Sequence, residues 1–150
     1  MNIHFLYGTE TGTSEMLCED IRDDLDLQCE ITSMGDFDAS TLDGDTFYIF
    51  VTSTYGTGDL PMTAQPFYDA IATNKPDLSH VHFAVFGLGD MVFADTFAFG
   101  SKILMELLVE RGAKMVGERG IHDASSPDLP EDIAVPWAQE IMGLAKAEAA

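Results

Sequence analysis

The residues best suited to chemistry lie in a short loop near the N-terminus, between an apolar segment and an amphipathic one. Residues 8–14 have the sequence Gly-Thr-Glu-Thr-Gly-Thr-Ser, which combines hydroxyl side chains with two glycines. If a helix begins there, its first N–H groups and its dipole favour an anion. The loop therefore predicts a site for one phosphate monoester. A plain strand-to-helix turn with Thr13 as the N-cap is the alternative.

The spacing of the glycines excludes two other phosphate loops. A nucleoside triphosphate loop has a wider glycine spacing and then Gly-Lys-Ser/Thr, whereas no lysine follows Gly12. A dinucleotide loop needs its glycines in a different pattern. The nearest basic residue is Arg22. Hydroxyl and amide groups must therefore hold the phosphate.

Two later segments also place glycine and aromatic residues directly after apolar runs. Residues 46–53 are followed by Thr-Tyr-Gly-Thr-Gly-Asp at 54–59, and residues 81–87 by Leu-Gly-Asp-Met-Val-Phe at 88–93. Loops that follow parallel strands meet at the carboxyl edge of the sheet, where ligands bind. Tyr55 and Phe93 could each offer a flat face to a planar ring. Ordinary core packing is the alternative for both.

Apolar strands alternate with helical patterns along the whole chain. We expect strands at 3–7, 29–33, 46–53, 81–87 and 113–117, with loops at 35–45 and 118–130. Helices are expected at 13–26, from Pro61 to about residue 73, at 95–111 with Gly112 at its C-cap, and at 131–145 with Trp137 in the core. This alternation predicts one α/β domain spanning 1–150, with a core of about 3–142 and a parallel sheet covered by helices on both faces.

The charge balance limits the partners. The formal net charge is −19, from 26 acidic and 7 basic residues. Nucleic acid and anionic membranes are disfavoured, and a basic protein partner is favoured, although a general adaptation for solubility would give the same charge. No apolar run could span a bilayer and no basic signal segment is visible, so we expect a cytoplasmic, monomeric protein.

Cysteine and histidine usage indicates no metal site. Cys18 and Cys29 are too few for a disulfide scaffold, and we expect both to be reduced and structural. The four histidines show no zinc-ligand spacing with them. No catalytic acid–base pair or nucleophile motif is evident either, which favours a binding or carrier protein.

Three segments, in this order, resemble the flavodoxin family. They are Gly8–Thr13, Ser53–Pro61, and Phe86–Asp90 with Phe93 and Phe97. The likeness covers about residues 3–142 and is greatest to short-chain flavodoxin-like proteins and to the FMN domains of diflavin reductases. It implies a five-stranded sheet of order 2-1-3-4-5 and FMN as the cofactor. It also implies one-electron shuttling between a reductase of the flavodoxin or ferredoxin type and acceptor enzymes.

The resemblance assigns roles to particular residues. The phosphate would be held by the first loop, one face of the ring system by Tyr55, and the pyrimidine edge by the loop after residue 87. Phe93 stands where relatives carry a tyrosine, and Asp90 where asparagine is commoner. The full set of implied FMN-binding residues is Thr9, Glu10, Thr11, Gly12, Thr13, Thr54, Tyr55, Gly56, Leu88, Gly89, Asp90, Phe93 and Asp123.

Two other functions stay open from the residues alone. One is a small FMN-dependent oxidoreductase acting on a quinone-like substrate, and the other is an interaction module without flavin. The carrier is favoured because no separate substrate pocket is evident and because the acidic charge suits transient protein docking.

Overall fold

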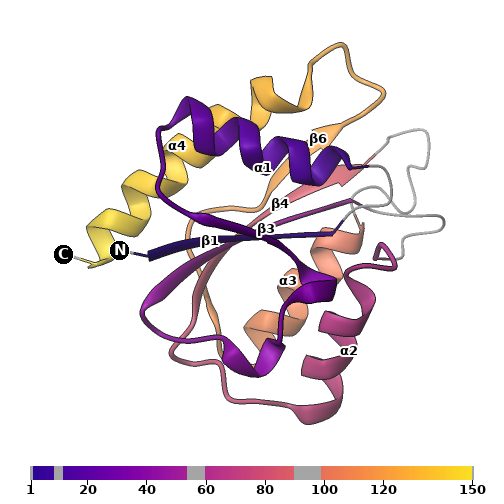
Figure 1. Cartoon of the computed structure of the whole chain (residues 1–150), viewed down its shortest axis with the longest axis vertical. Helices are drawn as coiled ribbons and strands as arrows, with labels where there is room; N and C mark the ends of the chain where they lie inside the picture. The colour runs from indigo at the N-terminus through magenta and orange to yellow at the C-terminus, as the bar shows by residue number, and fades with distance from the viewer. Residues whose placement is uncertain (1, 9–11, 54–59, 90–98, 150) are drawn as a thin grey trace.

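Six strands form one sheet between two layers of helices (Figure 1). The computed structural model describes residues 2–8, 12–53, 60–89 and 99–149. The strands are β1 (Asn2–Gly8), β2 (Glu30–Ser33), β3 (Thr46–Ser53), β4 (His82–Gly89), β5 (Lys114–Met115) and β6 (Gly120–Asp123). The helices are α1 (Thr13–Asp24), α2 (Gln65–Asn74), α3 (Phe99–Glu110) and α4 (Pro130–Ala149), with short 3-10 turns η1 (Met34–Asp36) and η2 (Ala39–Thr41).

The strands are parallel throughout and follow the order β2-β1-β3-β4-β5, with β6 also paired to β4. The expected order is therefore confirmed. The fifth position is shared by two short strands, because Gly117 adopts a positive φ of 71° between them. This left-handed conformation, which glycine tolerates, interrupts the edge strand.

Helices cover both faces of the sheet. Figure 1 shows α1 and α4 on one face and α2 and α3 on the other. Adjacent residues of β1 illustrate the consequence: Phe5 packs in the core under α1 and α4, while Leu6 packs in the core over α2 and α3. Both are fully buried. This is why the strands are nearly continuous apolar runs rather than alternating ones.

Several expectations about element boundaries were wrong. The second helix begins at Gln65 and not at Pro61, since Pro61 starts a turn in which its carbonyl accepts from Ala64 and Gln65. Pro66 then lies in the first turn of α2, where its missing N–H costs no helix bond. The segment 118–130, expected to be loop, contains β6.

Two more boundaries differ from expectation: β5 covers only Lys114–Met115 of the expected strand 113–117, and α4 extends to Ala149, past its expected end at residue 145. The expected start of the third helix at residue 95 lies outside the described residues. The remaining boundaries agree closely with the sequence. β3 matches its expected range, and Gly112 follows α3 with φ of 100°, as a helix-ending glycine should. Trp137 is half-buried, with its ring 5.2 Å from that of Phe86, and its indole N–H donates to the Glu118 carbonyl at 3.0 Å. It therefore fastens α4 to the edge of the sheet.

Candidate functional site

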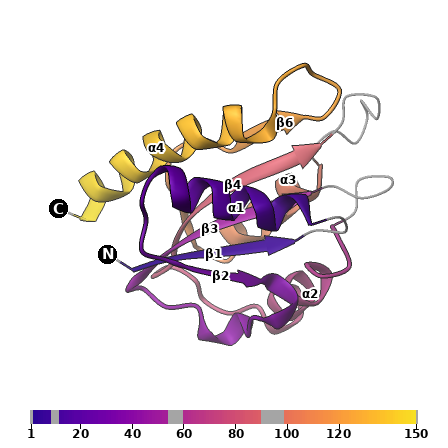
Figure 2. The same cartoon turned by 45° about the horizontal axis from the view of Figure 1, so that its top comes forward.

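The carboxyl ends of β1, β3, β4 and β6 meet at one edge of the sheet. Gly8 pairs with Thr52, Ser53 with Leu88, and Gly89 with Asp123. Figure 2 shows the arrowheads of β1 and β4 pointing to the same edge. The strand ends that precede the three predicted loops are thus neighbours in space.

Helix α1 begins at this edge, immediately after the first loop. Gly12 is its N-cap residue, with φ of 87° and no side-chain cap, and the Met16 N–H bonds its carbonyl at 3.1 Å. Because Thr13 is already inside the helix, it does not act as the N-cap, and the plain capped turn with Thr13 in that role is wrong. Among the described residues, no heavy atom lies within 4 Å of a Cβ built on Gly12.

Ser14 lies in the first turn of α1 and is fully buried. Within the described part of the chain its Oγ is a buried polar atom with no hydrogen-bond partner. A buried hydroxyl left unsatisfied costs about 1–3 kcal/mol. An acceptor supplied by a bound group would satisfy it, and a phosphate oxygen at a helix N-terminus is such an acceptor.

Gly8 allows the end of β1 to approach the segment before α2. A Cβ built on it would lie 2.7 Å from the Cβ of Ala64 and 2.9 Å from the Oγ1 of Thr52. No side chain fits there without movement of its neighbours. The first loop therefore leaves the sheet at a fixed, close-packed point.

Tyr7 and Glu15 connect β1 to the first turn of α1. The Tyr7 hydroxyl donates to Oε2 of Glu15 at 2.5 Å. This hydrogen bond, together with partial burial, raises the pKa of Tyr7 to about 12. The pair fixes the start of α1 against the strand. Arg22, the nearest cation in sequence, bonds Asp23 at 2.9 Å near the other end of α1.

The ends of β4 and β6 form the opposite flank of this edge. The Ala124 N–H donates to the Gly89 carbonyl at 2.7 Å, which continues the pairing of Gly89 with Asp123. Oδ1 of Asp123 accepts from the backbone and hydroxyl of Ser125. The Leu88 side chain is buried in the core beneath α1 and α4, so Leu88 can line a ligand site only through its backbone.

One hydrogen bond at the start of α3, between Arg119 and Ser101, could not be predicted from the sequence. The Arg119 guanidinium donates to Oγ of Ser101 at 2.8 Å, and Ser101 is fully buried in the first turn of α3. Burial lowers the pKa of Arg119 from its ordinary value. The contact ties the start of α3 to the residue before β6. Arg119 and Ser101 are far apart in sequence, and only the sheet topology brings them together.

The structure gathers part of the predicted site. Gly12, Thr13, Leu88, Gly89 and Asp123 all lie at the carboxyl edge, on the two flanks just described. Ser14 is one of the hydroxyl residues of the predicted loop, but it is not among the FMN-binding residues that the resemblance implies. The remaining predicted residues lie outside the described part of the chain: Thr9, Glu10, Thr11, Thr54, Tyr55, Gly56, Asp90 and Phe93.

This arrangement defines a class of protein. In this chain the N-terminus of α1 lies at the carboxyl edge of a doubly wound parallel sheet. The buried hydroxyl of Ser14, which has no partner among the described residues, lies beside it, and the loop before α1 has no P-loop lysine. The chain is thus an α/β domain whose carboxyl edge suits a singly phosphorylated ligand. The residues present therefore fit the phosphate of FMN.

Comparison with known proteins identifies the family. The profile described as Flavodoxin matches residues 5–137, most of the chain, and the chain therefore belongs to the flavodoxin family. Members of this family bind FMN, and the expected cofactor is confirmed at that level.

Individual relatives agree with this membership. Protein MioC of Escherichia coli K12 is 31% identical over 153 residues, covering 97% of this chain and 99% of that protein. NADPH-dependent diflavin oxidoreductase 1 of Cryptococcus neoformans is 32% identical over 145 residues, covering 93% of this chain. The chain spans only 23% of the length of that oxidoreductase.

Solved structures show the same fold. Flavodoxin 2 from Bacillus cereus superposes with a TM-score of 0.80 at 28% identity, covering 95% of this chain and 99% of that one. A cysteine-to-alanine mutant of the flavodoxin from Pseudomonas aeruginosa gives a TM-score of 0.76 at 31% identity, covering 97% and 99%. Among the described residues, no helix combines the length and apolar character that crossing a membrane requires.

Proposed function

We propose that this flavodoxin carries electrons, one at a time, from a flavin reductase to an acceptor protein, with FMN held at the carboxyl edge of its sheet. The observation that carries the proposal is the buried, unpartnered Oγ of Ser14 beside the N-terminus of α1. Bound FMN would supply the reactive ring. The chain binds it, orients it and sets the charge around it.

The proposed contacts follow the three loops. The phosphate is held by Thr9, Glu10, Thr11, Gly12 and Thr13, with Ser14 as an additional donor. Gly12 supports this role because its left-handed backbone opens the start of α1 without a side chain. Any other residue would be strained in this backbone conformation.

The ring system is held by the second and third loops. Thr54, Tyr55 and Gly56 cover one face and the adjacent edge. Leu88, Gly89 and Asp90 line the pyrimidine edge, and Phe93 covers the other face. Asp123 lies beside the pyrimidine edge of the ring system, a placement supported by its pairing with Gly89.

The donor and acceptor are proteins that dock at this edge. The diflavin oxidoreductase relatives and the sulfite reductase flavoprotein of Zymomonas mobilis carry NADPH in their names. An NADPH-linked flavin reductase is accordingly the donor we propose. With a net charge of −19, docking favours basic surfaces on both partners and a monomeric carrier in the cytoplasm.

Reconstitution tests the proposal. FMN added to purified apoprotein should give a one-to-one complex in calorimetry, and a basic reductase with NADPH should then reduce the bound flavin at a rate that falls with added salt. Rapid oxidation of NADPH by the isolated holoprotein would instead favour the small quinone-type oxidoreductase. Absence of any complex with FMN would contradict both.

A further inference from the structure

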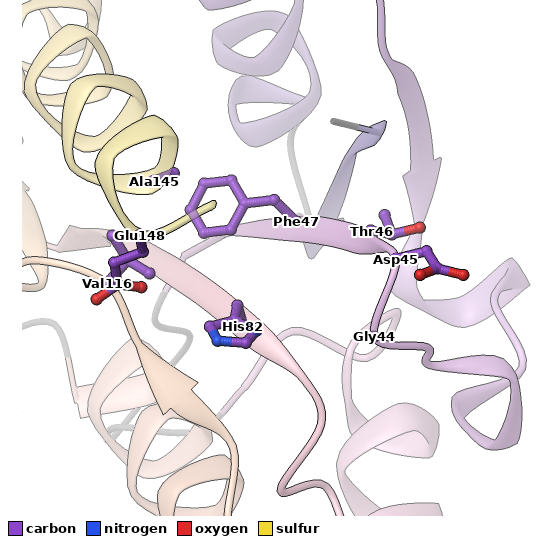
Figure 3. A pocket seen from close by; sticks show the side chains of 8 residues that line it. All are labelled: Gly44, Asp45, Thr46, Phe47, His82, Val116, Ala145 and Glu148. Carbon is purple, nitrogen blue, oxygen red and sulfur yellow. The ribbon is translucent and has the colours of Figure 1, made fainter. Parts of the chain in front are cut away.

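A second concave site lies at the opposite edge of the sheet from the proposed FMN site. A cavity of about 320 Å³ opens where β3 and β4 begin, under the last turn of α4 (Figure 3). This volume is within the range of small-molecule sites. Because the strands are parallel, the cavity and the FMN site are separated by the full length of β3 and β4.

The floor of the cavity is largely apolar, with His82 as its one polar side chain among the described lining residues Phe47, His82, Val116 and Ala145. Phe47 and His82 are register partners on neighbouring strands, so their side chains lie on the same face of the sheet. Phe47, Val116 and Ala145 are each at most 5% exposed, although all three line the cavity. Ala145, a small side chain, is the residue that α4 contributes to this apolar part of the lining.

The two ends of the cavity are acidic. Figure 3 shows the carboxylate of Glu148 beside Val116 on one side of Phe47 and that of Asp45 on the other side. Both residues are exposed. In the described part of the chain neither carboxylate forms a hydrogen bond or an ion pair. The C-terminal pole of α4 adds a partial negative charge at the Glu148 end.

The described residues that line the cavity include no lysine or arginine. Lys146, the basic residue in the last turn of α4, is not among the residues that line the cavity. Among the described residues no group of three or more histidine, cysteine or acidic side chains is placed to hold a metal ion. Apolar side chains between two carboxylates fit an organic cation with two charges and an apolar centre.

We propose that this cavity binds a linear aliphatic diammonium ion, with its methylene chain over Phe47 and one ammonium group at each of Glu148 and Asp45. The chain buries apolar surface against the floor, and each ammonium group gains a charge-assisted contact with a carboxylate. The strongly acidic surface raises the local concentration of such a cation. The site is independent of the FMN site and its occupancy does not depend on the redox state of the flavin.

The test uses the full-length, FMN-loaded protein and three probes of equal chain length: cadaverine, pentylamine and pentanediol. Amide and methyl NMR shifts are followed at low ionic strength. We expect cadaverine to shift signals of Phe47, Val116 and Ala145, and to bind about three- to tenfold more tightly than pentylamine. Pentanediol should not bind. Equal affinity for cadaverine and pentylamine would overturn the use of both carboxylates.

Matched variants separate the site from general attraction by a polyanion. Glu148→Gln and Asp45→Asn should each weaken cadaverine binding about three- to tenfold, whereas Glu140→Gln removes the same charge from an exposed position of α4 outside the cavity and should leave the affinity unchanged. Ala145→Leu should fill the space and abolish the shifts, with far-UV circular dichroism checking the fold. Equal weakening by all three charge variants, or shifts spread over the whole acidic surface, would overturn the proposal.

Discussion

The two edges of the sheet are built from opposite chemistry. At the carboxyl edge lie glycines, hydroxyl side chains and the N-terminus of α1, together with the unpartnered hydroxyl of Ser14. At the amino edge lie the C-terminal end of α4 and the carboxylates of Asp45 and Glu148 above an apolar floor. One edge suits a phosphate, and the other suits an ammonium group.

The difference follows from strand direction more than from composition. In a parallel sheet every helix that follows a strand starts at the carboxyl edge and ends at the amino edge, so the helix dipoles point the same way. A chain with a net charge of −19 can therefore still favour an anion locally. Local dipoles and donors, not the net charge, decide which edge of the sheet suits a phosphate.

The largest expected effect is on the free energy of unfolding, when one glycine at each edge of the sheet is replaced by alanine. Gly8→Ala should lower the free energy of unfolding by about 2 kcal/mol, because the new Cβ would lie 2.7 Å from the Cβ of Ala64. FMN binding should weaken as well, since the first loop leaves the sheet at this residue. Gly44→Ala at the amino edge, whose Cβ would lie 3.1 Å from the His80 carbonyl oxygen, should cost less than about 1 kcal/mol. Urea unfolding measures both. Equal losses would mean that the carboxyl edge is no more tightly packed than the other.

A smaller effect is expected on the redox potential of bound FMN. It tests whether the charge of the acidic surface acts on a ligand at the carboxyl edge. The fully reduced flavin carries an extra negative charge, which 26 acidic residues disfavour. The potential for adding the second electron to bound FMN should therefore be more negative than that of free FMN, by roughly 60 mV, equivalent to about 1.4 kcal/mol. Added salt should reduce the difference by screening. A potential equal to or above that of free FMN in a spectroscopic titration would show that local donors outweigh the surface charge.

Much of this comparison could be predicted from the sequence. Apolar runs located β1, β3 and β4 closely, because strands covered on both faces need continuous apolar residues. The same runs placed the loops that follow them at one edge. The candidate phosphate loop could be singled out because its hydroxyls and glycines are close together in the chain.

What escaped prediction depends on contacts between distant segments. β6 has only four residues, Gly-Ile-His-Asp, with no strong apolar pattern, and it exists because it pairs with β4. Its Gly120 is required since a Cβ there would lie 2.4 Å from the ring of Phe86. The amino-edge cavity was likewise invisible, because β3, β4 and the end of α4 contribute one or two residues each.

Two buried serines, each in the first turn of a helix, provide a comparison that tests the proposed phosphate site. Ser14→Ala should leave the free energy of unfolding of the apoprotein unchanged or slightly higher, since it removes an unsatisfied hydroxyl. It should weaken FMN binding about five- to tenfold, which corresponds to about 1–1.4 kcal/mol. Ser101→Ala should instead destabilise the apoprotein by about 1 kcal/mol, because Arg119 loses an acceptor. Calorimetry with FMN and urea unfolding provide the two readouts, and unchanged FMN affinity in Ser14→Ala would exclude this hydroxyl from the site.

The smallest effect concerns the hydrogen bond between Tyr7 and Glu15 at the carboxyl edge. Folding raises the pKa of Tyr7 to about 12 from its ordinary value of 10.0, so the contribution of this bond is complete below pH 10 and is lost as the pH rises toward 12. Because Tyr7 is only partly buried, the contribution is under about 1 kcal/mol. Tyr7→Phe should therefore be slightly less stable than the parent chain at pH 8, and the difference should vanish near pH 12. Urea titrations of both proteins across this range measure it. A difference that persists at the highest pH would show that Tyr7 stabilises the edge by packing and not through its hydroxyl.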